Sequence, residues 1–397
     1  MRNFVWTRLL FAPYGIAVGL CILVMGVLMA SAGPLLPVVI ANEIGLDKVG
    51  VATFFLTNTL VGIVIALGTG YLSDGMIARY KLVLIGGVFS AVGYFGIASA
   101  AQPLQVFFAG PCIGGIGILF TQLFAVAKDG VVAEWEPEQQ VIGITMLRTL
   151  FSFGYILGTA VSSLLARAAD IQSTFYLIAG AAVVLAVFGT LLMYRIERYI
   201  KARQARVVAS DRPAAAREIT LPFVALIVPL LSLIVLQGAD STRLSYLSLV
   251  MFQMFRDASI APMMFGIGAA VELVTMSLMG YLSSKIRENV VIAIGALCGV
   301  VQFLILAFAD SLPVLYLGAV IHAVFVAALF GVAMAYIQRL LAHRTGFGGA
   351  LYVTVLNLGS LVGILSPLLV TGYDQKIFVI PAILCALGAV LLLVGDK

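Results

Sequence analysis

Long apolar stretches separated by short polar ones run along the whole of this chain. Each stretch approaches or exceeds the ~20 residues that a helix needs to cross a bilayer. None shows the polar-apolar alternation over ~10 residues that a membrane β-barrel requires. The pattern therefore predicts an all-α membrane protein with twelve transmembrane helices, at 13–41, 50–73, 82–101, 104–127, 141–166, 172–194, 221–253, 260–283, 290–309, 312–338, 347–372 and 376–395.

A sequence repeat divides these segments into two sets. The string GYLSD at 70–74 closes the second segment, and GYLSS at 280–284 closes the eighth, each with basic residues shortly after it. Repetition at this distance indicates two copies of one multi-helix unit. We therefore expect two pseudo-symmetric six-helix halves, 1–194 and 221–397, joined by an arginine-rich linker at 195–220.

Composition and charge fit a membrane protein. The chain is 62% hydrophobic and 10% charged, against roughly 25% charged residues in soluble domains. Its net charge of +5 reflects basic residues at the termini, the linker and the even-numbered connections, so nucleic-acid binding is not expected. The positive-inside rule places both termini and the linker in the cytoplasm. The four cysteines lie inside apolar segments without CxxC spacing, so neither a disulfide nor a metal site is expected.

Ionisable residues at membrane depth are costly and are functional candidates by default. This chain has Arg148, Asp240, Arg243, Glu272 and His322 at such positions. Asp240 and Arg243 are three residues apart and share a helix face, which leaves open a cavity role and a local salt bridge. His322 is alone on an apolar helix, which favours a satisfied core histidine over a proton relay.

Five of the amide side chains within the apolar segments are further candidates. Such amides can recognise substrate hydroxyls, but in membranes they more commonly bond between helices, and both interpretations stay open. They are Asn58, Gln122, Gln237, Gln338 and Asn357.

Paired glycines four residues apart occur in the fifth and eleventh segments. They are Gly154 with Gly158, and Gly359 with Gly363. Small residues at this spacing let two helices approach closely. A phosphate-binding loop is excluded, because no strand precedes them and no Lys-Ser or Lys-Thr follows.

The class of membrane protein follows from what the sequence lacks. An enzyme needs a nucleophile with its base, or a metal cluster, yet the only histidines are His322 and His343 and there is no HExxH or GxSxG. A channel more often uses rings of like residues from symmetric subunits. No nucleotide-binding motif supports a primary pump. We expect a secondary transporter without cofactor or metal.

Two parallel six-helix repeats joined by a linker are the architecture of major facilitator transporters. The signature that follows helix 2 in that superfamily resembles Gly70, Leu72, Asp74, Arg79 and Lys81 of this chain. The resemblance implies that Gly70, Asp74 and Arg79 form a conformational motif. It places Asp74 near the start of helix 11 in one transport state.

Three further stretches look like the bacterial sugar efflux transporters of this superfamily. They are TQLFAVAKD at 121–129 together with Arg148, GAAVEL around Glu272, and YIQRLLAHRTG to GGALY at 336–352. The resemblance implies export of small sugars or glycosides in exchange for protons by alternating access. It also implies a monomer in the bacterial inner (plasma) membrane. Proton-coupled efflux of drugs or other amphipathic molecules is the alternative.

In that fold helices 5 and 8 face each other, so Arg148 and Glu272 could form a buried pair. The pair could serve substrate or proton coupling, or only join the two halves. The expected partners are a small-molecule substrate, protons and the lipid bilayer. Proton coupling is assigned to Glu272 and Asp240. Substrate binding is assigned to Asn58, Gln122, Arg148, Gln237, Asp240, Gln338 and Asn357.

Overall fold

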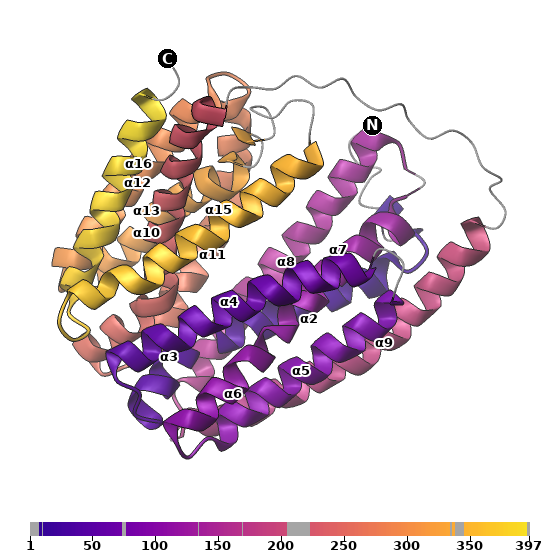
Figure 1. The fold of residues 1–397 in the computed structure, drawn as a ribbon, viewed down its shortest axis with the longest axis horizontal. Coiled ribbons are helices and arrows are strands. Elements are labelled where there is room, and N and C mark those ends of the chain that lie inside the picture. The colour runs from indigo at the N-terminus through magenta and orange to yellow at the C-terminus, as the bar shows by residue number, and fades with distance from the viewer. Residues whose placement is uncertain are drawn as a thin grey trace. The chain divides into compact units, whose positions relative to one another are not determined.

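The fold comes from a computed structural model, in which all regular secondary structure of the described residues is helical (Figure 1). This confirms the all-α prediction. The residues that the structure describes are 8–9, 11–73, 77–133, 135–168, 170–204, 223–333, 336–337 and 345–394.

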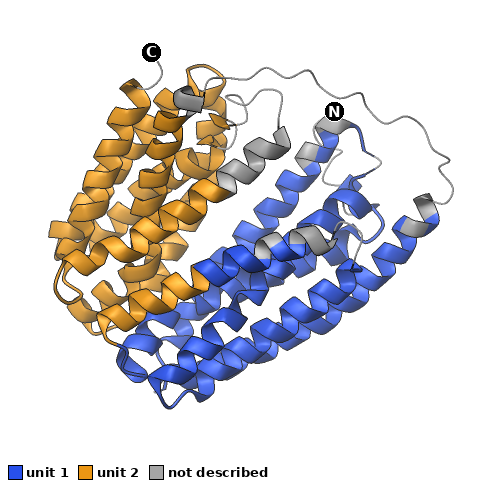
Figure 2. Ribbon diagram, viewed as in Figure 1, with its two compact units in different colours: residues 1–46, 60–213 blue, residues 47–59, 214–397 orange. Residues whose placement is uncertain are grey.

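The chain forms two compact units, coloured separately in Figure 2. Unit 1 comprises residues 1–46 and 60–213, and unit 2 comprises 47–59 and 214–397. Helix α4 (Lys48–Ser73) contributes residues to both. Unit 1 further contains α2 (Gly15–Ala32), α3 (Leu36–Val38), η1 (Val39–Glu43), α5 (Arg79–Ser99), α6 (Pro103–Ile113), α7 (Gly115–Val126), η2 (Ala127–Val131), α8 (Pro137–Leu165), η3 (Gln172–Thr174) and α9 (Phe175–Gln204).

Unit 2 is built around a buried apolar core to which several of its helices contribute. Phe303, Phe325 and Phe378 are among the largest fully buried side chains of this core. The elements of unit 2 are α10 (Phe223–Phe255), α11 (Ile260–Ser283), α12 (Glu288–Phe308), α13 (Leu312–Gly331), α15 (Thr345–Leu365), η4 (Ser366–Leu369), η5 (Gln375–Phe378) and α16 (Val379–Val394).

Membrane-spanning helices are found where the sequence predicts them. Within the described residues, 11 helical stretches are long and apolar enough to cross a bilayer, and each overlaps one predicted segment. The remaining predicted segment, 347–372, contains α15 and the shorter apolar stretch Thr354–Leu369. The chain is therefore a multi-pass membrane protein.

Helix α9 continues past the predicted start of the linker at 195 and ends at Gln204. Arginine, lysine and alanine are good helix formers. Basic side chains are also favoured in the last turns by the partial negative charge of a helix C-terminus. The boundaries 194 and 221 between the two halves stay a prediction, since residues 205–222 lie outside the described part.

The predicted glycine pairs are packing positions, which confirms the interpretation from their spacing. A Cβ atom at Gly154 of α8 would lie 2.1 Å from the backbone oxygen of Leu23, and one at Gly158 would lie 2.4 Å from that of Val27. Real Cβ contacts are essentially never shorter than 3.0 Å. Only glycine therefore lets α8 approach α2 this closely.

The same arrangement recurs in unit 2 between α15 and α10. A Cβ atom at Gly359 would lie 2.4 Å from Cβ of Gln237, and one at Gly363 would lie 2.3 Å from the Gly238 oxygen. The hydroxyl of Thr242 donates a hydrogen bond to the Gly363 oxygen at 3.1 Å. This close packing fixes the part of α10 that carries Asp240 and Arg243.

Candidate functional site

A cluster of ionisable side chains lies inside unit 2. Asp240, Arg243 and His322 are each 3% exposed. Nε2 of His322 on α13 lies 3.2 Å from Oδ1 of Asp240 on α10. His322, predicted as a core residue, is buried as expected and has a carboxyl partner from another helix. Its Nδ1 has no hydrogen-bond partner within the described residues.

Arg243 extends the cluster from α10 to α11. Its guanidinium carbon lies 4.5 Å from the centroid of the Phe265 ring, close enough for a cation–π interaction. A Cβ atom at Gly268 would lie 4.0 Å from Nη2 of Arg243. Gly268 therefore lies beside the guanidinium, at ordinary van der Waals distance for an added methyl group.

Glu272 completes the cluster from α11, one helical turn after Gly268. It is half-buried and interacts electrostatically with both Asp240 and Arg243. Three helices therefore bring together two carboxylates, one guanidinium and one imidazole. The sequence predicted only that Asp240 and Arg243 share a helix face, and the structure adds Glu272 and His322 to them in one cluster.

The charge balance of this cluster indicates what it can do. With His322 neutral and both carboxylates ionised, Arg243 neutralises only one of the two negative charges. Uncompensated buried charge is strongly unfavourable. One proton on Asp240, Glu272 or His322 makes the cluster neutral. The arrangement is therefore suited to hold one exchangeable proton.

A line of polar side chains continues from this cluster along α10. Nε2 of Gln237 donates to Oγ of Ser241 at 3.2 Å, and Oγ of Ser241 lies 3.1 Å from Oγ of Ser360 on α15. Gln237 is 4% exposed, and its Oε1 lacks a hydrogen-bond partner in the described parts of the chain. Gln237 is therefore linked to α15 through Ser241, and its amide oxygen is a buried acceptor without a partner among the described residues.

The other predicted substrate residues lie on several helices. Asn58 on α4 and Gln122 on α7 each have a buried amide oxygen with no hydrogen-bond partner among the described residues. Asn357 on α15 is half-buried. Gln338 lies outside the described residues. Arg148 on α8 is exposed. It belongs to unit 1 and Glu272 to unit 2, so their pairing stays a prediction.

The motif after helix 2 is only partly described. Gly70 lies within α4, whereas Asp74 lies outside the described residues. Arg79 begins α5, and its Nη1 lies 2.8 Å from Oδ2 of Asp129 in η2. In the sequence, Asp129 stands out only as part of the stretch 121–129 that resembles sugar efflux transporters, and the ion pair with Arg79 was not predicted. The ion pair therefore connects the basic end of the motif to η2, which follows α7.

Sequence reasoning also missed a contact of Lys48, at the start of α4. Its Nζ donates to the Val370 oxygen at 2.6 Å and to the Gly372 oxygen, and lies 5.8 Å from the centroid of the Tyr373 ring. Burial and the nearby Asp47 carboxylate raise the pKa of Tyr373 to about 12. No local pattern indicates this contact, because Lys48 and Val370 are far apart in the chain.

A model of the Major Facilitator Superfamily matches residues 18–287 and 230–397 of this chain. A Deinococcus radiodurans protein assigned provisionally as a sugar efflux transporter is 23% identical over 88% of this chain and 89% of its own length. Sugar efflux transporter B of Salmonella typhimurium is 22% identical, over 85% of this chain and 84% of its own. Sugar efflux transporter C of Escherichia coli gives the same identity and coverage.

Solved structures share the fold. The crystal structure of a nucleoside transporter matches with a TM-score of 0.75 and 13% identity, over 96% of this chain and 97% of the other. That of a D-xylose–proton symporter matches with a TM-score of 0.70 and 15% identity, again over 96% and 97%.

Proposed function

This chain belongs to the Major Facilitator Superfamily, and on that premise we propose that it exports small sugars or glycosides in exchange for protons. As a member of this superfamily it is a membrane transporter and not an enzyme. Alternating access around a site near the middle of the membrane is the mode of transport we propose. The native state we propose is a monomer in the bacterial inner membrane.

The observation that carries proton coupling is the buried cluster of Asp240, Arg243, Glu272 and His322. Two carboxylates share one permanent cation, so the cluster is neutral only with one added proton. We propose that Glu272 exchanges this proton, because it is less buried than Asp240. Asp240 holds His322 at 3.2 Å and is the second candidate.

Available amide acceptors support a sugar as the substrate. The amide oxygens of Asn58, Gln122 and Gln237 are buried and lack hydrogen-bond partners within the described residues. Sugar hydroxyls donate hydrogen bonds, and leaving a buried acceptor unsatisfied costs about 1–3 kcal/mol. These amides would therefore favour a hydroxyl-rich substrate over an apolar one. The relatives named as sugar efflux transporters point to the same class.

The transport experiment uses inverted membrane vesicles and a panel of labelled monosaccharides, disaccharides, glycosides and hydrophobic dyes. We expect uptake of at least one sugar or glycoside, driven by an acidic vesicle interior and abolished by an uncoupler. Glu272→Gln should lose gradient-driven uptake but keep exchange of labelled for unlabelled sugar. Gradient-driven uptake of dyes but of no sugar would replace this proposal by drug efflux.

The orientation we propose has its own test. A reporter placed within 200–215 or at the C-terminus should show cytoplasmic location, because basic residues concentrate at the linker and the even-numbered connections. Periplasmic reporter activity at either position would contradict the orientation.

A further inference from the structure

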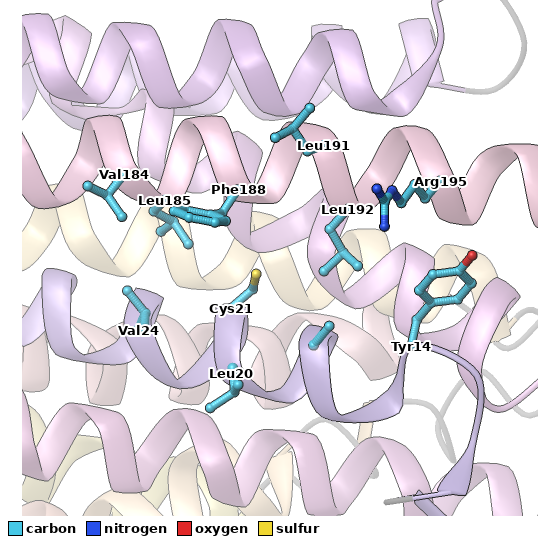
Figure 3. A pocket seen from close by; sticks show the side chains of 11 residues that line it. Tyr14, Leu20, Cys21, Val24, Val184, Leu185, Phe188, Leu191, Leu192 and Arg195 are labelled. Carbon is cyan, nitrogen blue, oxygen red and sulfur yellow. The ribbon is translucent and has the colours of Figure 1, made fainter.

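A long apolar groove lies between α2 and α9 on unit 1. Its volume is about 660 Å³, within the roughly 300–1,000 Å³ of ligand pockets. Figure 3 shows Val24 and Val184 at one end, Cys21 and Phe188 in the middle, and Tyr14 and Arg195 at the other end. All eleven lining side chains are apolar except those of Tyr14, Cys21 and Arg195.

The length of the groove matches one leaflet of a bilayer. It follows α2 from Tyr14 to Val24 and α9 from Val184 to Arg195. At 1.5 Å per residue these stretches are about 15 and 16 Å long. The hydrocarbon core is ~30 Å thick, so one leaflet is about 15 Å. Both helices belong to membrane-spanning stretches, so the groove has the depth of one acyl chain.

The polar end of the groove has the features of a membrane interface. The rings of Tyr14 and Tyr199 make an edge contact with centroids 6.0 Å apart. Tyr199 also lines a second hollow of about 280 Å³, together with Arg8 and Trp135. The Arg8 guanidinium lies over the Trp135 ring at 5.1 Å. Aromatic and basic side chains gather at the level of lipid headgroups.

We propose that this groove is a binding site for one anionic phospholipid. One acyl chain lies along the apolar part, past Cys21 and Phe188. The Arg195 guanidinium pairs with the phosphate, and the Tyr14 hydroxyl donates a hydrogen bond to it. Arginine suits this role because its planar group binds phosphate oxygens in a bidentate manner. The site does not depend on which substrate the protein transports.

Other occupants fit the groove less well. A sugar would find no amide or carboxylate among the lining residues. An amphipathic cation would be repelled by Arg195. Inorganic phosphate would leave the apolar length empty, and exposed side chains such as Phe188 (65%) and Leu191 (58%) would stay uncovered. An anionic lipid matches both the apolar length and the charged end.

Two substitutions test the two parts of the site separately. Arg195→Gln removes the phosphate partner, and Arg195→Lys retains its charge. Cys21→Phe fills the groove with a larger side chain, whereas Cys21→Ala leaves it open. Arg198→Gln is the charge-matched control, because Arg198 lies over the Tyr194 ring and does not line the groove.

The measurement is binding of phosphatidylglycerol to the detergent-purified full chain by native mass spectrometry, with phosphatidylcholine of the same chains as reference. Wild type should bind the first phosphatidylglycerol at least tenfold more tightly than phosphatidylcholine. Arg195→Gln and Cys21→Phe should both abolish this preference. Arg195→Lys, Cys21→Ala and Arg198→Gln should retain most of it.

Three results would overturn the site. The first is an equal loss in Arg195→Gln and Arg198→Gln, which would indicate general charge attraction. The second is full preference in Cys21→Phe, which would show that no acyl chain enters the groove. The third is loss of the preference when inorganic phosphate competes at concentrations comparable to the lipid, which would indicate a phosphate site. A thermal unfolding scan of each variant without lipid identifies any that is misfolded, and the remaining variants decide.

Discussion

If Asp240 is ionised, its contact with His322 should contribute measurably to the stability of the protein. We consider Asp240→Ala, His322→Ala and the double variant. Each single substitution removes one side of a contact of 3.2 Å between two buried side chains. Asp240→Ala also leaves Arg243 with one carboxylate fewer nearby.

The expected magnitudes follow from burial and charge. Removing one partner of a buried charged pair costs about 3–5 kcal/mol, because the other partner loses its compensation. The coupling between the two substitutions should be about 1.5–3 kcal/mol, as for a hydrogen bond to a charged group. Neutral hydrogen bonds between membrane helices average only about 0.6 kcal/mol. The coupling energy therefore distinguishes an ionised Asp240 from a neutral one.

The assay is a double-mutant cycle on the unfolding free energy of the purified protein in detergent. Ser248→Ala with Asp240→Ala is the control, because Ser248 is about 12 Å along α10 from Asp240 at 1.5 Å per residue. At that separation the two substitutions should be additive within about 0.5 kcal/mol. A coupling of 0.6 kcal/mol or less between Asp240 and His322 would refute an ionised Asp240 in the cluster.

Three further predictions concern other parts of the chain. Gly363→Ala should destabilise the protein by about 1–3 kcal/mol or more, because the added methyl group overpacks the α10–α15 contact. Gly280→Ala is the control and should not destabilise it, because the space at its Cβ is open. Equal thermal unfolding of the two variants would contradict the close packing. Lys48→Met should lower the unfolding temperature through the loss of hydrogen bonds to Val370 and Gly372. Lys285→Met, at an exposed lysine, is the control and should lower it less. Identical shifts in the two variants would mean that the hydrogen bonds of Lys48 contribute nothing to stability. Asp74→Asn should slow transport with little change in substrate affinity. A carboxylate near a helix N-terminus is favoured by about 0.3–1 kcal/mol and would stabilise one transport state over the other. Weak substrate binding with normal turnover would indicate a substrate role instead.

The helices and their closest contacts were predictable because their signals are local. The length of the apolar stretches alone located the spans. A segment that crosses the lipid core must satisfy its backbone hydrogen bonds internally, and a helix does so. The glycine pairs at 154 and 158 and at 359 and 363 predicted close packing from spacing, and both make it. The end of α9 was not predictable in the same way, because arginines and alanines are as compatible with a helix as with a linker.

The sequence predicted the members of the cluster, but of their arrangement only that Asp240 and Arg243 share a helix face. The cost of charge in lipid nominated Asp240, Arg243, Glu272 and His322. Nothing in the sequence indicates that His322 meets Asp240, because the two lie on different helices far apart in the chain. The contact of Lys48 with Val370 joins equally distant segments. Such pairings depend on how each helix is rotated and tilted. Tertiary packing determines the rotation and tilt, and the local sequence pattern does not indicate them.

The central claim is that the cluster around Asp240 and Glu272 holds one proton that substrate binding releases. The direct measurement is the number of protons released when the purified protein, in weakly buffered solution with a pH indicator, is saturated with a sugar that it transports. Wild type should release about one proton per chain, because that is the number that neutralises the cluster. Glu272→Gln should bind the sugar and release none. Equal proton release by wild type and Glu272→Gln, or none by wild type, would contradict the account.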